Sequence, residues 1–259
     1  MHLIIWIVAF TALGGVLSTL VAALFLLLSP ELRARLLPTL ISFAIGALLG
    51  AAFLAVLPHA LQDAGGNAHG IMTAILLGLL LFFLLEKIVL WRHCHIDPCE
   101  AHTPAPTRNK TSPAGYLILV GDGIHNFVDG ILVAAAFFTD IHLGIVTSLA
   151  VVAHEIPQEL GDFAVLLHSG FSQGKALFYN MLSSLAMVVG GVVAYFSLSW
   201  ISQAVPYVLA IAASSFIYIA VADLIPGLHK RVEIRATIHQ IVLILAGVAT
   251  IFIADTTLH

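Results

Sequence analysis

Long apolar runs, separated by short polar breaks, dominate the pattern of positions along this chain. A helix that crosses a bilayer needs roughly 20 mostly apolar residues, and runs of about this length recur between the prolines, glycines and charged residues. The pattern predicts eight such helices, at residues 3–28, 38–60, 70–91, 113–138, 142–167, 173–200, 204–226 and 236–255. The expected fold class is therefore all-α: a polytopic membrane helix bundle of eight transmembrane helices, with residues 1–259 forming a single domain.

The composition excludes a soluble protein. Of the 259 residues, 60% are hydrophobic and only 9% are charged, whereas soluble domains carry about 25% charged residues. The formal net charge is -4 and there is no basic cluster beyond short loops, which excludes nucleic acid as a partner and leaves the lipid bilayer. The first run, Leu3 to Leu28, lacks a preceding Lys or Arg and a small-residue cleavage pattern, so we interpret it as a retained span rather than a signal peptide.

The basic residues occupy alternate connections between the predicted helices. They fall at or beside the first, third, fifth and seventh connections: Arg33, Arg35, Lys87, Arg92, Arg108, Lys110, Lys175, Lys230, Arg231 and Arg235. An even number of spans brings both termini to one side, and Lys and Arg are retained on the cytoplasmic side. We therefore expect a multi-pass protein of the cell membrane with both termini outside.

The only extended polar stretch is residues 92–113, which predicts an irregular cytosolic loop that divides the spans into three and five. It carries the metal-ligating side chains His93, Cys94, His95, Cys99 and His102. A reducing cytosol argues against a disulfide, and thiols close to imidazoles suit a soft metal. A regulatory metal-binding loop and a plain disordered linker both remain open.

Acidic and imidazole side chains gather on two predicted helices, although such groups are costly at membrane depth. At about 100° per residue, the members from the fourth span share an arc of about 100° and those from the fifth an arc of about 140°. The two sets are Asp122, His125, Asn126 and Asp129, and His154, Glu155, Gln158, Glu159 and Asp162. Two such faces opposed would form a cage for a borderline divalent ion such as zinc, rather than polar contacts that only join helices.

Other ionisable residues suggest a pathway beside this cage. Asp223 is a lone carboxylate deep in the seventh span, and with Asp122 and Asp162 it is a candidate for the path of an ion or for accepting protons. His59 follows Pro58 near the outer end of the second span. It is either an entrance ligand or a helix-end histidine with a local hydrogen bond, and both remain open.

A further group of polar residues is expected to be structural. Glu86 precedes Lys87 at the inner end of the third span, where both side chains can reach the interface. Asn180, Ser183 and Ser184 in the sixth span are expected to hydrogen-bond a neighbouring helix. Pro157 lies within the ligand cluster and predicts a kink there.

Two segments carry a resemblance to a known family. His125-Asn126-Phe127-Val128-Asp129-Gly130 and His154-Glu155-Ile156-Pro157-Gln158-Glu159-Leu160-Gly161-Asp162-Phe163 resemble the two signature helices of the ZIP family of divalent-metal transporters. The eight spans, the outside termini and the histidine-bearing loop are similar to that family, so the resemblance covers nearly the whole chain. Residues 57–60 and 218–226 are lesser matches.

The resemblance implies a single transporter domain that moves divalent ions into the cytoplasm by alternating access, often as a homodimer. It implies a binuclear site between the fourth and fifth spans, with His125, Asn126, Asp129, His154, Glu155 and Gln158 as ligands and Glu159 completing or flanking the cage. Zinc is the expected substrate, with Fe2+, Mn2+, Co2+ and Cd2+ as alternatives. Two departures stand out, because the most similar branch usually has His at position 158 and Glu at position 227. Gln158 is a weak neutral ligand that favours harder ions.

Two other functions compete with metal transport. His154-Glu155 begins like the H-E-x-x-H pattern of a zinc metalloprotease, but Gln158 replaces the second histidine and Pro157 interrupts the helix. A proton-coupled carrier of an organic solute would also use membrane carboxylates, but no buried Lys or Arg is present to pair an organic anion. We therefore expect a transporter and not an enzyme.

Overall fold

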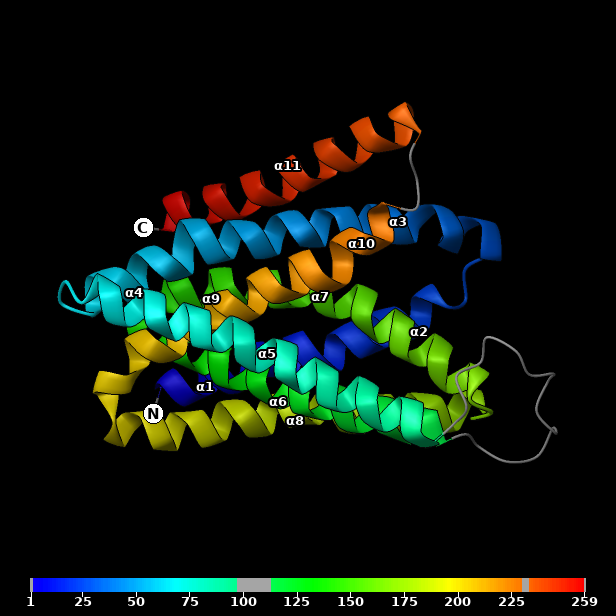
Figure 1. The fold of residues 1–259 in the computed structure, drawn as a ribbon, viewed down its shortest axis with the longest axis horizontal. Helices are drawn as coiled ribbons and strands as arrows, with labels where there is room; N and C mark the ends of the chain where they lie inside the picture. The colour runs from blue at the N-terminus through cyan, green and yellow to red at the C-terminus, as the bar shows by residue number, and fades with distance from the viewer. Residues whose placement is uncertain (1, 97–112, 230–232, 259) are drawn as a thin grey trace.

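The computed structural model describes residues 2–96, 113–229 and 233–258 of the chain. Within these ranges every regular element is helical, and no strand occurs in them. The helices run along one common direction and form an elongated bundle (Figure 1). The predicted all-α helix bundle is therefore confirmed.

Several of the long helices are built from consecutive segments. The first is α1 (His2–Ala12), η1 (Leu13–Leu17) and α2 (Ser18–Phe25), and the second is α3 (Pro30–Gly50), η2 (Ala51–Val56) and α4 (Leu57–Asp63). Four uninterrupted helices follow: α5 (Ala68–Ile96), α6 (Pro113–Thr139), α7 (Ile141–His168) and α8 (Gln173–Trp200). The last segments are η3 (Ser202–Ala204), α9 (Val205–Tyr218), η4 (Ile219–Leu224), α10 (Ile225–Leu228) and α11 (Ile234–Leu258).

Seven helices of the described chain are long and apolar enough to cross a membrane. Every predicted span except residues 142–167 has its counterpart among them. That span is α7, which is 28 residues long but carries the polar cluster around Glu155 and Glu159, and this cluster lowers its hydropathy. The helix that breaks the apolar pattern is therefore the one that carries the candidate ligands.

Two helices extend beyond their predicted ends. α3 begins at Pro30 rather than at residue 38, because Ser29 caps it by accepting a hydrogen bond from the Leu32 amide at 3.4 Å. α5 continues to Ile96, so the first residues of the predicted 92–113 loop are helical. The side chains of His93, Cys94 and His95, together with Cys99 and His102, lie outside what the structure describes.

The chain ends and the connections fall into two groups. Both termini lie at one end of the bundle, together with the α4–α5 and α8–α9 connections (Figure 1). The α2–α3 and α7–α8 connections lie at the opposite end, with the end of α5 and the start of α6. The two described connections next to Arg33, Arg35 and Lys175 therefore lie at the same end of the bundle.

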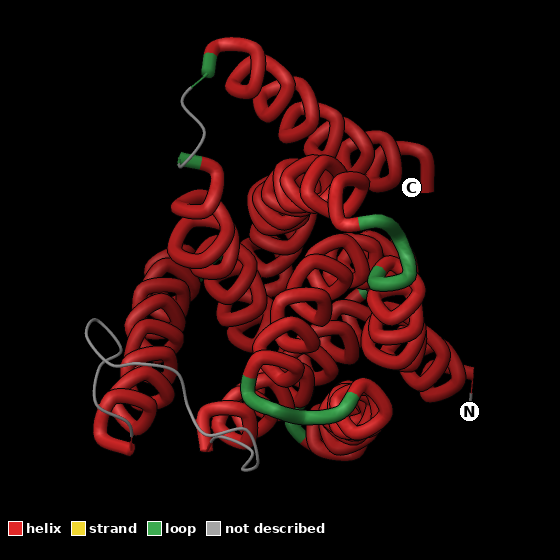
Figure 2. Tube along the Cα trace, turned by 90° about the vertical axis from the view of Figure 1, so that its right-hand side faces the viewer, coloured by secondary structure: helices red, strands yellow, loops and turns green. Residues whose placement is uncertain are grey.

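Glycines bring α6 and α8 into close contact. A Cβ atom at Gly190 would collide with the Phe127 carbonyl oxygen, and one at Gly130 would collide with the Met187 carbonyl oxygen. Small residues at a helix crossing allow backbones to approach in this way. α7 in turn packs against α2, α3, α6 and α8, whereas α11 lies at the edge of the bundle (Figure 2). The two helices with the candidate ligands are thus held together inside the bundle.

Candidate metal centre

A short connection sets α6 against α7. Asp140 separates the two helices and caps α7, because its Oδ1 accepts hydrogen bonds from the amides of His142 at 2.7 Å and Leu143 at 3.3 Å. Two helices joined by so short a connection run antiparallel as neighbours. The middle of α6, with His125 and Asp129, therefore faces the middle of α7.

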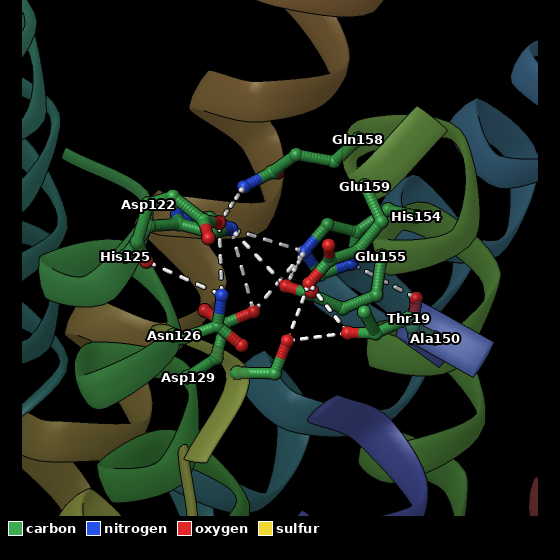
Figure 3. A network of polar contacts seen from close by, with 11 residues as sticks. Thr19, Asp122, His125, Asn126, Asp129, Ala150, His154, Glu155, Gln158 and Glu159 are labelled. Carbon is green, nitrogen blue, oxygen red and sulfur yellow. Dashed lines mark hydrogen bonds and ion pairs between the residues drawn. The ribbon is translucent and has the colours of Figure 1, made fainter. Parts of the chain in front are cut away.

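Four side chains converge between these helices, namely His125, Asp129, His154 and Glu155 (Figure 3). One ligand atom from each lies within 4.8 Å of the others. His125 Nε2 is 3.6 Å from Asp129 Oδ2, 3.5 Å from Glu155 Oε1 and 3.4 Å from His154 Nε2. His154 Nε2 is 3.0 Å from Asp129 Oδ2 and 3.6 Å from Glu155 Oε1. We call these residues the four-residue site.

The spacing of the four-residue site matches tetrahedral zinc. Zinc lies about 2.0–2.2 Å from imidazole nitrogen and carboxylate oxygen, so the edges of the ligand tetrahedron are about 3.3–3.6 Å long. Four of the five distances above run from 3.4 to 3.6 Å and correspond to edges of that size, and the fifth, between His154 Nε2 and Asp129 Oδ2, is shorter at 3.0 Å. Two imidazoles and two carboxylates are also a donor set that zinc accepts.

The carboxylates of the four-residue site lack other partners. Asp129 and Glu155 are fully buried, and none of their carboxylate oxygens accepts a hydrogen bond within the described part of the chain. Burial of an ionised carboxylate without compensation is unfavourable. A divalent cation at the centre of the four ligands would supply this compensation.

A hydrogen bond from the backbone fixes the orientation of one imidazole. Nδ1 of His154 hydrogen-bonds the Ala150 carbonyl at 3.2 Å, one turn earlier in α7. This bond places the N–H on Nδ1 and leaves Nε2 as the lone-pair donor toward the centre. Pro157 lies inside α7, and the kink expected at this residue stays a prediction.

The predicted amide ligands hydrogen-bond Asp122 through their side-chain nitrogens, while the ligand oxygen of Asn126, Oδ1, is buried and has no hydrogen bond within the described residues. Asn126 donates to Asp122 Oδ1 at 2.9 Å, and Gln158 donates to the same oxygen at 3.4 Å. Asp122 precedes His125 by one turn of α6. The structure therefore gathers these three predicted site residues into a second polar group beside the first (Figure 3).

Glu159 belongs to a different network. Its Oε1 accepts hydrogen bonds from Thr19 at 3.0 Å and Ser184 at 2.7 Å, and its Oε2 accepts one from Asn180. The carboxylate thus faces α2 and α8 rather than the four ligands. Asn180 and Ser184 were expected to bond a neighbouring helix and do so, whereas Ser183, expected to do the same, donates to the Tyr179 and Asn180 carbonyls of its own helix. The contribution of Thr19 had no signal in the sequence.

A cavity of about 440 Å³ lies beside the four-residue site. His125 lines it, so the cavity adjoins the candidate ligands, and the other polar lining residues include Asp122, Gln158, Asp162, Asp223, Glu86 and Tyr218. No Lys or Arg is among the described residues that line it. The three predicted pathway carboxylates therefore share one space, which is suited to a cation.

The structure also places Glu86 and His59, two residues outside the ligand cluster. Glu86 was expected to reach the interface with Lys87, but it lines the cavity and accepts a hydrogen bond from the Tyr218 hydroxyl. The expectation failed because Tyr218 is distant in sequence. Nδ1 of His59 hydrogen-bonds the Ala55 carbonyl at 2.9 Å, one turn earlier in the chain, as Nδ1 of His154 does with Ala150, so a role of His59 as an entrance ligand stays a prediction.

Comparisons with known proteins agree with the geometry. The model of the family described as "ZIP Zinc transporter" matches residues 92–255. The chain is 32% identical over 251 residues to zinc transporter ZIP13 of Pongo abelii, an alignment that covers 91% of this chain and 73% of that protein. It is 32% identical over 253 residues to zinc transporter ZIP4 of Homo sapiens, covering 75% of this chain and 39% of that protein. With its apolar helices, the chain is therefore a multi-pass membrane protein that belongs to the ZIP family of metal transporters, which are not enzymes.

Proposed function

We propose that this protein moves zinc into the cytoplasm and binds the ion in transit at His125, Asp129, His154 and Glu155. The observation that supports this most strongly is the spacing of four ligand side chains, which suits tetrahedral zinc. Two of these side chains are buried carboxylates whose oxygens accept no hydrogen bond within the described residues. The two imidazoles favour zinc over harder ions. Fe2+, Mn2+, Co2+ and Cd2+ are competitors to be included in the test.

The proposed site offsets the loss of water from the ion. A divalent ion that enters the membrane exchanges its hydration shell for protein ligands, and anionic ligands offset that cost most effectively. The ion then leaves through the acidic cavity that His125 shares with Asp223. In keeping with the family resemblance, we include a second ion between α6 and α7 and alternating access to the two sides.

We further propose that α7 crosses the membrane as an eighth span, in a three-plus-five arrangement with both termini outside. The positions of Lys and Arg support this orientation. On the family resemblance we also propose that the protein is a homodimer. Light scattering of the detergent-solubilised protein would measure its molar mass and so test this state.

Cysteine labelling tests the orientation. In a variant that lacks Cys94 and Cys99, a single cysteine at Lys175 should react only with reagent on the cytosolic side, because it begins α8 at the basic end. A cysteine at Gly65, in the α4–α5 connection, should react only from outside. The reverse labelling would contradict the proposed orientation.

Removal of one ligand should nearly abolish zinc flux. In liposomes that contain the purified protein, Asp129→Ala or His154→Ala should lower the initial rate of zinc uptake at least about 10–100-fold. Loss of a residue that only hydrogen-bonds a metal ligand already costs roughly this factor, and loss of the ligand itself should cost no less. Uptake is measured with a panel of divalent ions, with and without a pH gradient. Glu233→Gln, which alters an exposed carboxylate outside the cavity, is the control. Full transport by the two ligand variants at equal protein content would refute the assignment.

Glu159 should contribute to stability and not to metal affinity. Glu159→Gln retains an acceptor for Thr19 and Ser184 and should leave zinc affinity unchanged. Glu159→Ala leaves buried donors without a partner, which costs about 1–3 kcal/mol in the free energy of unfolding for each group. Zinc titration and thermal unfolding measure the two effects. A loss of zinc affinity in Glu159→Gln as large as in Glu155→Gln would instead make Glu159 a ligand.

A further inference from the structure

Asp122 holds the side-chain amide of Asn126 in one orientation. Nδ2 of Asn126 donates a hydrogen bond to Oδ1 of the Asp122 carboxylate at 2.9 Å and another to the Asp122 backbone carbonyl at 3.2 Å. Both neighbours on this side of the amide are acceptors, so only its nitrogen end can face them. The oxygen end of the amide, Oδ1 of Asn126, is therefore turned away from Asp122.

The oxygen end of this amide has no partner of its own. Asn126 is fully buried, and its Oδ1 accepts no hydrogen bond within the described residues. A buried acceptor without a donor is unfavourable. Asn126 follows His125 directly and precedes Asp129 by three positions, so it shares the face of α6 that carries two of the proposed ligands (Figure 3). A cation bound beside this face would satisfy the free oxygen.

The Asp122 carboxylate is better suited to hold the amide than the backbone carbonyl is. A hydrogen bond to an ionised acceptor is roughly twice as strong as one between neutral groups. Asp122 lies one turn before Asn126 in α6 and is itself buried, so water does not compete for this bond. Without the carboxylate, only the backbone carbonyl would hold the amide, which could then turn and direct its N–H groups at a cation.

We propose that Asp122 is a positioning residue for metal binding, which holds the amide of Asn126 so that its oxygen, and not its nitrogen, faces the transported ion. The inference rests on the proposed function. Asp122 acts through Asn126 and is not a ligand itself. Loss of a partner that orients a metal ligand typically costs about 10–100-fold in metal affinity, and we expect a loss of this size for Asp122.

Zinc affinity of Asp122 variants tests the inference. Equilibrium dialysis with radioactive zinc is carried out on the purified full-length protein in detergent, with Cys94 and Cys99 replaced by Ser so that thiolates bind no zinc. Asp122→Leu removes the acceptor and should raise the dissociation constant for zinc about 10–100-fold. Asp122→Asn keeps a side-chain oxygen that accepts from Nδ2 and should stay close to the parent. Asp63→Leu, the same change at an exposed position at the end of α4, is the control and should leave the affinity unchanged.

A double-mutant cycle separates positioning from other roles. Asn126→Ala has no amide to orient and should itself weaken zinc binding. Addition of Asp122→Leu to this variant should cause no further loss, because the effects of residues that act as one unit do not add. Asp122→Ala is measured in parallel, so the cycle does not depend on whether Leu fits at this position, and thermal unfolding without zinc identifies the variants that are folded.

The outcomes separate this inference from the proposed function. The inference would be overturned if Asp122→Leu and Asp122→Ala bound zinc as tightly as the parent, or if Asp122→Asn bound it as weakly as Asp122→Leu. It would also be overturned if loss of the Asp122 carboxylate weakened binding by the same factor with and without Asn126, since Asp122 would then be a ligand or a support of the fold. The proposed function survives each of these results and fails only if Asp129→Ala binds and transports zinc like the parent.

Discussion

Two buried carboxylates, Asp129 and Glu155, which contact the imidazoles of His125 and His154, impose the strongest physical constraint on this molecule. They are buried in the middle of an apolar bundle, and no residue in the described part of the chain donates a hydrogen bond to them. The effective cost of burying one ionised group is several kcal/mol. His125 and His154 stand within 3.6 Å of these carboxylates, so the arrangement is a ligand set whose stability depends on the cation that it binds.

The rest of the bundle holds these four residues in place, and α8 is the common support. It contributes no ligand to the four-residue site, yet it fixes both helices that do. Close glycine contacts at Gly130 and Gly190 set α6 on α8. The carboxylate of Glu159 ties α7 to Asn180 and Ser184 of α8, and through Thr19 to α2. The positions of the ligands therefore depend on contacts that lie outside the metal centre.

The apolar runs alone were sufficient to predict the helical bundle, since length and hydrophobicity determine which segments can cross a bilayer. Helical periodicity was also sufficient to place His125 and Asp129 on one face and His154 and Glu155 on another. The start of α3 was missed because Arg33 and Arg35 were read as a connection, although Ser29 and Pro30 are a helix-start signal.

The sequence could not show which residues of the polar cluster face α6 and which face other helices. Glu155 and Glu159 lie one turn apart and share an arc, but only the first faces α6. Which neighbour a side chain meets depends on how the helices pack, and Thr19 is 140 positions from Glu159. For the same reason, the hydrogen bond from the Tyr218 hydroxyl to Glu86 could not be predicted from the sequence.

X-ray absorption at the zinc edge tests the central claim most directly, because it reports the atoms bound to the ion. With one equivalent of zinc per chain, the account predicts two imidazole nitrogens and two carboxylate oxygens at about 2.0–2.2 Å. In His154→Ala the imidazole scattering should fall by half. A zinc ion bound by sulfur at about 2.3 Å, or a spectrum without imidazole, would contradict the account.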